Sequence, residues 1–163
     1  CRGRGGVVKN IYIEDIVMMN IPTEPLLFDL HYGGKSAVEA AAEGASPFDV
    51  EYVEADETTP QFRDIYIKDV VCSGAARAMY FNGIPEKNIE NIVVEDCEIV
   101  STKGADLRYS NGVQLRNVNI TQSEGQSYSV ANCSNVLIED CTDASGSESL
   151  NVFQHNSTNV KID

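Results

Sequence analysis

Side chains that could carry out acid–base or metal chemistry are sparse in this chain of 163 residues. The two histidines, His31 and His155, are far apart in the sequence, and no Cys/His cluster has the spacing of a zinc site. The Arg2–Gly6 segment has the composition of a turn with basic flanks, not of a phosphate-binding loop between a strand and a helix. No G-x-S-x-G pattern marks a serine nucleophile. The sequence therefore contains no complete motif for these classes of chemistry.

A short sequence motif, here called the phrase, recurs along the chain and indicates the secondary structure that must position any functional side chains. Apolar residues alternate with polar ones inside the phrase, and it closes on Asp or Asn. The six copies are Asn10–Asp15, Asp64–Asp69, Asn91–Asp96, Gly112–Asn117, Asn135–Asp140 and Asn159–Asp163. Successive copies start about 54, 27, 21, 23 and 24 residues apart, and periods of this size are typical of stacked-repeat proteins.

Each phrase predicts a β-strand with one buried face, because its apolar residues recur with a period of two. The closing Asp or Asn predicts a bend, since these residues tolerate left-handed backbone geometry. A second strand-like segment precedes every phrase after the first: 26–32, 76–82, 106–110, 127–132 and 150–155. Such a repeat is too short for a propeller blade and lacks the helical periodicity of ankyrin or tetratricopeptide repeats. We therefore expect an all-β parallel β-helix of about six turns, forming a single domain over residues 1–163.

The long first interval between copies contains an acidic excursion, residues 35–60, with seven acidic residues and one lysine. Within it, Ser36–Glu43 predicts a short helix, because the serine can cap the helix N-terminus and an acid follows three residues on. Residues 54–60 predict a loop. The excursion is expected to be either a solvated surface loop or a wall beside a binding groove.

The five cysteines are expected to be buried free thiols, because their number is odd and no C-x-x-C spacing occurs. Cys97 and Cys141 occupy the same position in their repeats, with Val118 between them. Stacked strands lie about 4.8 Å apart, so these two sulfurs would be separated by about 10 Å, which is beyond the reach of a disulfide. Free thiols behave as small apolar side chains and suit the interior of a stack.

The net charge and the hydropathy of the chain limit the classes of partner that we expect. The net charge of −13 argues against nucleic acid, because phosphate binding needs a basic surface. No apolar run approaches the length of about 18 residues that a membrane-spanning helix needs, so no membrane contact is expected. The chain opens on Cys1 without the pattern of a signal peptide, and we expect the domain to be truncated at both ends.

Several segments resemble glycoside hydrolase family 28, the polygalacturonases. Residues 2–13 look like the segment that immediately follows the family's R-x-K motif, and residues 27–34, 59–65 and 83–92 also match. The resemblance covers the whole chain, has the style of bacterial pectin-degrading members, and corresponds to the C-terminal part of the family's β-helix. It implies a right-handed, pectin lyase-like solenoid in a secreted or periplasmic protein.

The family resemblance implies inverting hydrolysis of galacturonate-containing pectic polysaccharide. One carboxylic acid protonates the leaving oxygen, and a carboxylate pair activates water. In the family these groups come from N-T-D, D-D and G-H-G motifs, while R-x-K holds the substrate carboxylate; none of the four motifs occurs here. We therefore expect no catalytic residue, metal or cofactor in this chain, and the missing N-terminal turns of the parent protein would supply the chemistry.

One substrate contact carries over from the family, in which a tyrosine about thirty residues after R-x-K lines the cleft. Tyr32 stands at that position, and His31 and Arg4 are further candidates for substrate binding. Arginine suits a galacturonate carboxylate because its guanidinium can bind bidentately. Other side chains that the second strands could expose to the same groove are Asp29, Arg77, Tyr80, Asn82 and Arg108.

Two other functions remain open at this point. The chain could be a non-catalytic carbohydrate-binding or structural β-helix segment. It could also belong to a pectate lyase-type β-helix that uses Ca²⁺, with Asp69 and Asp96 in adjacent turns as ligands, although their role as bend residues explains them more simply. Open strand edges at both ends of the stack also predict modest stability or end-to-end association.

Overall fold

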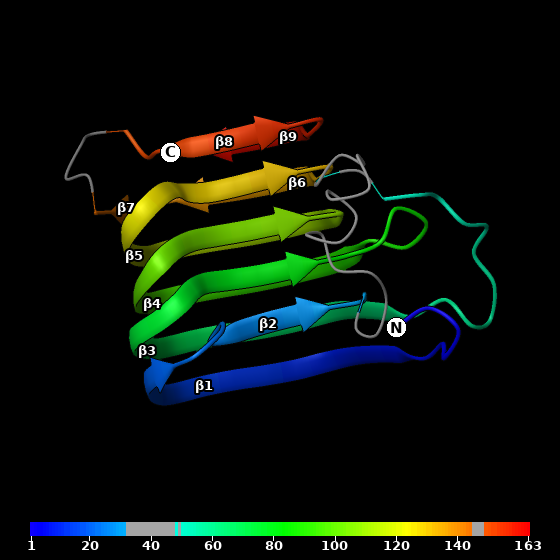
Figure 1. The fold of residues 1–163 in the computed structure, drawn as a ribbon, viewed down its shortest axis with the longest axis horizontal. Coiled ribbons are helices and arrows are strands. Elements are labelled where there is room, and N and C mark those ends of the chain that lie inside the picture. The colour runs from blue at the N-terminus through cyan, green and yellow to red at the C-terminus, as the bar shows by residue number, and fades with distance from the viewer. Residues whose placement is uncertain (32–47, 49, 145–148) are drawn as a thin grey trace.

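The chain forms a parallel sheet that is coiled into a solenoid (Figure 1). The computed structural model describes residues 1–31, 48, 50–144 and 149–163. The strands are β1 (Val7–Ile21), β2 (Leu26–Asp29), β3 (Gln61–Asn82), β4 (Ile89–Arg108), β5 (Ser110–Ala131), β6 (Ser134–Glu139), β7 (Thr142–Asp143), β8 (Val152–His155) and β9 (Thr158–Ile162). Every pairing between these strands is parallel. The described residues contain no helix and complete about four turns, so the predicted parallel β-helix is confirmed.

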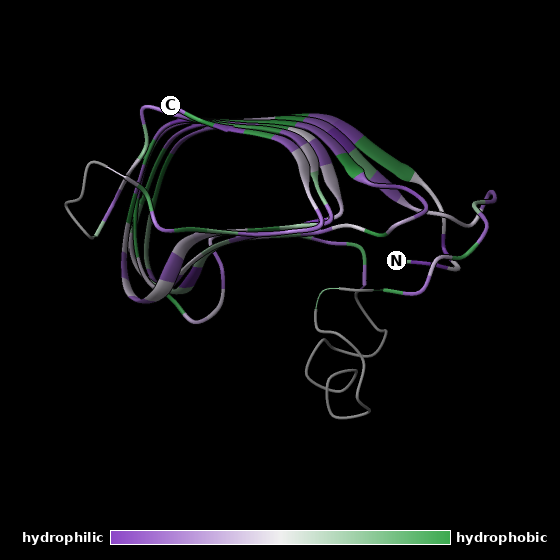
Figure 2. Ribbon diagram, turned by 90° about the horizontal axis from the view of Figure 1, so that it is seen from above, coloured by the Kyte–Doolittle hydropathy of each residue, from purple (hydrophilic) through white to green (hydrophobic). Residues whose placement is uncertain are grey.

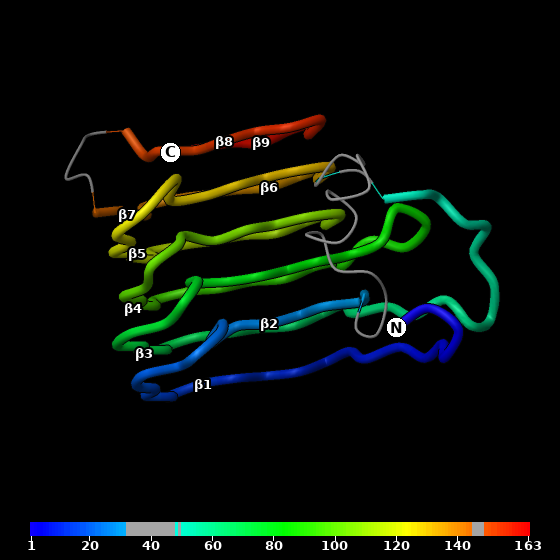
Figure 3. The backbone as a smooth tube through the Cα atoms, in the orientation of Figure 1, coloured from blue at the N-terminus to red at the C-terminus, as the bar shows by residue number. Residues whose placement is uncertain are grey.

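The six copies of the phrase become six neighbouring strands on one side of the solenoid. Their order is β1-β3-β4-β5-β6-β9, and the register places Ile11 on Ile65 and Ile65 on Ile92. Seen end-on, the successive turns superpose (Figure 2). β1 lies at one end of the stack, and β8 and β9 lie at the other (Figure 3).

Each long strand wraps around more than one side of the solenoid. The 22-residue β3 changes direction at residues with positive φ, namely Asp64 (56°), Asp69 (53°) and Gly74 (88°). The sequence predicted separate strands joined by bends, but the ladder continues through the bends on the same strand. Of the predicted second strands, 76–82 and 127–132 are therefore the last parts of β3 and β5, whereas 26–32 and 150–155 contain the separate strands β2 and β8.

Branched aliphatic residues of the phrase fill the interior on this side. In the middle turns each of them is at most 1% exposed: Ile65, Ile67, Ile92, Val94, Val113, Leu115, Val136 and Ile138. Burying one such side chain contributes about 1.5–3 kcal/mol. This column is the main apolar support for the sheet, and it confirms that the alternating residues of the phrase point the same way.

Asparagine and aspartate residues form columns along the bends. The closing residues of the phrase have φ between 49° and 56°, which confirms the predicted left-handed bends at Asp15, Asp69, Asp96, Asn117 and Asp140. The opening residues have the same geometry, including Asn91 at 54° and Asn135 at 54°. Amide groups link successive turns: Asn159 Nδ2 donates to Asn135 Oδ1 at 2.6 Å, and Asn117 Nδ2 donates to Asp96 Oδ1 at 2.7 Å. The columns satisfy polar groups that each bend would otherwise leave to solvent.

The N-terminal turn is fastened to the loop between β3 and β4. Arg2 Nε lies 2.5 Å from Glu86 Oε1, and Arg2 Nη2 lies 2.6 Å from Glu86 Oε2. The Glu86 side chain is 2% exposed and the Arg2 side chain 33%. Burial alone would raise the pKa of the Glu86 carboxyl, but the hydrogen bonds and charge of Arg2 outweigh it and lower that pKa. Arg2 is therefore a structural residue.

All five cysteines are free thiols, as expected. Cys72, Cys97 and Cys133 are buried, and Cys1 and Cys141 are half-buried. The register places Cys97 next to Val118, which separates it from Cys141. Burial raises the pKa of Cys97 to about 11 and that of Cys133 to about 12, so these thiols stay protonated at neutral pH.

In the acidic excursion, the described residues 48 and 50–60 form neither strand nor helix. This agrees with the loop predicted over 54–60. The helix predicted at Ser36–Glu43 lies outside the described residues.

Candidate functional site

The strongest candidate site is the outer surface of the side formed by β2, the ends of β3, β4 and β5, and β8. Alternation along these strands sends one set of side chains inward and the other outward. Strand register arranges the outward set in two rows: Leu27, Tyr80, Asp106, Ser129 and Phe153, and then Asp29, Asn82, Arg108, Ala131 and His155. We call these two rows the site face. Parallel stacking holds the side chains of each row at neighbouring positions on adjacent turns.

A buried ion pair occupies the centre of the site face. Asp106 and Arg108 are two residues apart on β4 and so point the same way. Arg108 Nε donates to Asp106 Oδ1 at 3.0 Å, and Nη2 donates to Oδ2 at 2.7 Å. Their side chains are 13% and 12% exposed. Burial would lower the pKa of the Arg108 guanidinium, but the hydrogen bonds and charge of Asp106 outweigh burial and raise that pKa, so the guanidinium stays positively charged.

Two guanidinium groups contact the Tyr80 ring. Arg77 Cζ lies 4.6 Å from the centre of the Tyr80 ring, and Arg108 Cζ lies 5.5 Å from it. Burial raises the pKa of the Tyr80 hydroxyl, an effect that the two positive charges only partly offset. Arg77 also contacts Glu24, across a long distance of 3.4 Å between Nη1 and Oε1. Tyr80 therefore presents a neutral hydroxyl beside a guanidinium that its carboxylate partner holds only weakly.

One edge of the site face is a hydrogen-bonded cluster around Asp29. Asp29 Oδ1 accepts from Asn82 Nδ2 and from the His31 backbone N–H, both at 2.9 Å. His31 Nε2 lies 2.7 Å from the Gly83 carbonyl oxygen, which can only accept, so this ring nitrogen carries a proton. A Cβ at Gly83 would lie 2.1 Å from the Tyr109 carbonyl oxygen, so the close approach of the backbones requires glycine. The cluster fixes His31 as an anchoring group.

Two residues of the acidic excursion, Phe48 and Val50, lie at the other end of the site face. The Phe48 ring lies 5.5 Å from the Phe153 ring and 5.4 Å from the His155 ring, with Arg108 Cζ 5.3 Å from its centre. Asn132 Nδ2 donates to the Phe48 carbonyl oxygen at 2.6 Å, and the Val50 N–H donates to the Tyr109 hydroxyl at 2.8 Å. Phe48 and Val50 therefore lie beside the site face.

The residues proposed from the sequence divide into three groups. Asp29, Tyr80, Asn82 and Arg108 lie on the site face, and Arg77 and His31 contact its members. Arg4 is exposed in the turn before β1, and no contact joins it to these residues in the described part of the chain. Tyr32 lies outside the described residues.

The sequence interpretation missed Asp106 and Phe48, and it missed that Phe48 contacts Phe153 and His155. The spacing of Asp106 and Arg108 on one strand face was a usable signal, because residues two apart on a strand point the same way. Phe48 gave no such signal, since its contacts join residues about a hundred positions apart.

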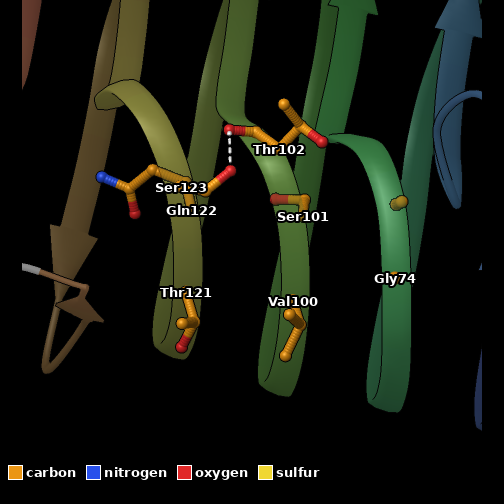
Figure 4. Close-up of a pocket in the computed structure, with 8 residues that line it drawn as sticks. Gly74, Val100, Ser101, Thr102, Thr121, Gln122 and Ser123 are labelled. Atoms are coloured by element: carbon orange, nitrogen blue, oxygen red, sulfur yellow. Dashed lines mark hydrogen bonds between the residues drawn. The ribbon is translucent and has the colours of Figure 1, made fainter.

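A shallow groove of about 330 Å³ lies where β3, β4 and β5 turn between two sides (Figure 4). Its walls are Gly74, Ala75, Val100, Ser101, Thr102, Thr121, Gln122 and Ser123. Ser101 Oγ donates to the Lys103 carbonyl oxygen at 2.8 Å, and Ser123 Oγ donates to that of Thr102 at 3.5 Å. No acid, base or cation lines the groove, so it offers only neutral hydrogen bonding.

The described residues contain no group of three or more His, Cys, Asp or Glu side chains placed to hold a metal ion. In particular, Lys68 Nζ lies 4.0 Å from Asp69 and 3.6 Å from Asp96, so both of these bend carboxylates have a cationic neighbour. In the same part of the chain, no helix is long and apolar enough to span a membrane.

The site face as a whole is suited to binding. Both oxygens of Asp106 are bonded to Arg108, and Asp29 holds Asn82 and the His31 backbone. Tyr80 and Arg77 offer an aromatic ring with a hydroxyl and a positive charge on neighbouring positions of this face. No family model, no curated protein and no solved structure matches the chain.

Proposed function

We propose that the site face binds an acidic pectic polysaccharide as part of a polygalacturonase-like protein, and that this chain does not itself cleave it. The observation that carries the proposal is the placement of Arg77 and Tyr80. A tyrosine ring can pack on a pyranose ring while its hydroxyl donates a hydrogen bond, and a guanidinium pairs with a uronate carboxylate. Arg77 keeps one long contact with Glu24, which a closer carboxylate on the ligand can replace.

The family resemblance supplies the rest of this proposal. A parent protein of the family would be a secreted or periplasmic inverting hydrolase, and its preceding turns would carry the catalytic carboxylates. A right-handed, pectin lyase-like coil with one turn for each of the six phrase copies belongs to the same proposal. Its support is that parallel strand crossovers are right-handed in about 98% of cases.

The second candidate is a carbohydrate-binding segment without catalysis in its parent, and the site face fits both candidates. The carboxylates of Asp29 and Asp106 are both engaged by donors on the site face. An inverting hydrolase needs two carboxyl groups on either side of the scissile bond, with room for a water. The gene sequence upstream of Cys1 separates the two candidates: G-H-G, D-D and R-x-K motifs there support the hydrolase, and their absence from a full-length gene supports the binding segment.

Binding is tested by titrating the purified chain with oligogalacturonate and, separately, with a neutral galactan oligomer of equal length. Ionic strength is kept near 0.15 M, because the charge of −13 repels a polyanion and such repulsion is screened beyond about 8 Å. We expect heat of binding with the acidic oligomer only. Equal binding of both oligomers, or of neither, contradicts the proposal.

A pair of tyrosine variants locates the binding surface. Tyr80→Ala is expected to weaken binding of oligogalacturonate by about threefold to tenfold, the range that loss of one aromatic contact gives. Tyr66→Ala is the matched control, because Tyr66 stacks on Tyr12 on a different side of the solenoid, with ring centres 5.1 Å apart. Equal losses in the two variants would place the ligand elsewhere. Release of new reducing ends by the wild-type chain would show that it is catalytic after all.

A further inference from the structure

A second cation lies next to Arg77, on the neighbouring turn of the solenoid. In the register between β3 and β4, Lys103 stands opposite Arg77, and this register runs without a shift from Ala75 to Asn82. Opposite residues of parallel strands point to the same face of the sheet. Lys103 is exposed, and no ion pair holds it in the part of the chain that the structure describes. Two positive charges therefore stand on adjacent turns at the edge of the site face.

The two cations are close enough to act on one ligand group. Adjacent strands lie about 4.8 Å apart, so the backbones at Arg77 and Lys103 are separated by one strand spacing. Like charges at directly opposite positions of neighbouring strands destabilise a sheet. An anion bound between the two side chains would replace this repulsion with two favourable contacts. The pair therefore gains by binding a negative group.

The carboxylates of the chain next to this pair lie on its outer sides. The register of β2 with β3, extended by two residues, places Glu24 beside Arg77, and Glu24 Oε1 lies 3.4 Å from Arg77 Nη1. On the other side, Lys103 stands opposite Glu124 of β5, and these two side chains form no ion pair among the described residues. Along the stack the order is Glu24, Arg77, Lys103 and Glu124. In the same described residues, no carboxylate bridges the two cations.

Hydrogen bonds hold the backbone at both cations. The Arg77 N–H donates to the Thr23 carbonyl oxygen at 3.3 Å, and Ser101 Oγ donates to the Lys103 carbonyl oxygen at 2.8 Å. The guanidinium of Arg77 also packs on the Tyr80 ring, with Cζ 4.6 Å from the ring centre. The exposed Lys103 side chain can turn toward the same place. The turns therefore fix the positions of both cations, and a ligand has to order mainly the Lys103 side chain.

We propose that Arg77 and Lys103 together bind one carboxylate of the acidic saccharide, and that Lys103 is a second determinant of the charge specificity of the site face. This inference rests on the function proposed above. A guanidinium can hold both oxygens of a carboxylate, and a lysine ammonium adds a compact charge that donates from the neighbouring turn. The sugar ring that carries this carboxylate then lies against Tyr80. The two cations favour a uronate over a neutral sugar.

The test is a double-mutant cycle on the whole chain, with the affinity for oligogalacturonate as the readout. Lys103→Gln should weaken binding by about threefold to tenfold, because it removes a charge-assisted hydrogen bond at an exposed side chain. Arg77→Gln should weaken binding by about tenfold or more.

The double variant decides whether the two cations share one carboxylate. It should lose less affinity than the product of the two single losses, because a carboxylate that has lost one cation is held less firmly against the other. A combined loss equal to or greater than that product would overturn the shared contact, since residues that act on separate groups contribute independently.

Two further variants separate the charge of Lys103 from its packing. Lys103→Arg keeps the charge and should bind as the wild type does. Lys161→Gln removes the same charge from an exposed lysine of β9 on the phrase side, and it should leave the affinity unchanged. Equal weakening by Lys161→Gln and Lys103→Gln would show that net charge alone controls binding, which contradicts the assignment of Lys103.

Methyl esterification of the ligand gives an independent check, because an ester has no negative charge. The wild type and Lys103→Gln should bind a fully methyl-esterified oligogalacturonate equally weakly. A difference between them that persists with the ester would show that the lysine contacts another part of the sugar, and it would overturn the proposed carboxylate contact.

Urea unfolding tests whether Lys103 has a structural role instead. Lys103→Gln should be at least as stable as the wild type, because the change removes a like charge beside Arg77. A clear loss of stability would overturn the proposal.

Failure of this inference differs from failure of the proposed function. If the wild type does not bind oligogalacturonate, the proposed function fails, and this inference fails with it. If Arg77→Gln weakens binding while Lys103→Gln binds as the wild type does, only the role of Lys103 is overturned.

Discussion

At the scale of single residues, the polar groups of this protein are mostly committed to one another. Glu86 is tied to Arg2, Asp106 to Arg108, and Asp29 to Asn82 and His31. The repeat could not predict these pairs, because their partners lie between copies of the phrase or at the N-terminus. By contrast, the count and spacing of the cysteines predicted free thiols, although Cys1 and Cys141 are only half-buried.

The thiols should be protected by the fold. Burial raises the pKa of Cys97 to about 11 and of Cys133 to about 12, so both are protonated and inaccessible at pH 8. We expect iodoacetamide at pH 8 to modify Cys1 first, and to modify Cys72, Cys97 and Cys133 only after denaturant is added. Intact-mass spectrometry and peptide mapping check this order, and rapid labelling of Cys133 in the native protein would contradict it.

Replacing Glu86 with Gln should destabilise the protein at neutral pH. The pKa of the Glu86 carboxyl is lower in the folded state than in the unfolded state, where it is 4.5. The ionised carboxylate therefore stabilises the fold at every pH above 4.5. This stabilisation is lost as the pH falls through the folded-state pKa. We expect the variant to lose about 1.5–3 kcal/mol of unfolding free energy at pH 7, the contribution of a hydrogen bond to a charged group.

Comparing the wild type with Glu86→Gln at lower pH tests the direction of this pH dependence. The difference between wild type and Glu86→Gln in urea unfolding should shrink below about pH 4.5. The exposed Glu98 serves as the control, and Glu98→Gln should change stability little at any pH. A difference that grows on acidification would show that the pair does not act through the ionised carboxylate.

At the scale of the strands, the bend residues determine where each side of the solenoid begins. The sequence predicted the closing Asp and Asn bends correctly, because their side chains are the ones that tolerate positive φ. It did not show that the opening residue of the phrase has the same geometry. Apart from Gly112, the opening position also holds Asn or Asp, but only the stacked structure shows that Asn91, Asn135 and Asn159 donate hydrogen bonds to the preceding turn.

Variants of Asn135 should separate two contributions to stability, the side-chain hydrogen bonds of the column and the tolerance of a positive φ. Its φ is 54°, its Nδ2 donates to Asn111 Oδ1 at 2.8 Å, and its Oδ1 accepts from Asn159 at 2.6 Å. Asn135→Gly keeps the backbone geometry and loses the side-chain bonds, whereas Asn135→Ala also strains the backbone by about 1–2 kcal/mol. Chemical unfolding should therefore rank the wild type above the glycine variant and the glycine variant above the alanine variant. An alanine variant as stable as the glycine variant would show that the bend carries no conformational strain.

At the scale of the whole molecule, the parallel β-helix could be predicted from the period and alternation of the phrase. The site face could be predicted only in part. Strand alternation was enough to place Asp29, Tyr80, Asn82 and Arg108 together, since they occupy outward positions of adjacent turns. The contacts of Phe48 depend on how the chain returns from the acidic excursion, and no local pattern encodes that path.

The binding of an acidic saccharide by the site face is the central claim, and the affinity of the Arg77→Gln variant for oligogalacturonate tests it most directly. The matched control is Arg116→Gln, because Arg116 lies on the phrase side, between Glu95 and Glu139. We expect Arg77→Gln to weaken binding by about tenfold or more, since a hydrogen bond to a charged group contributes about 1.5–3 kcal/mol, and Arg116→Gln to leave it unchanged. An unaltered affinity in Arg77→Gln would contradict the account.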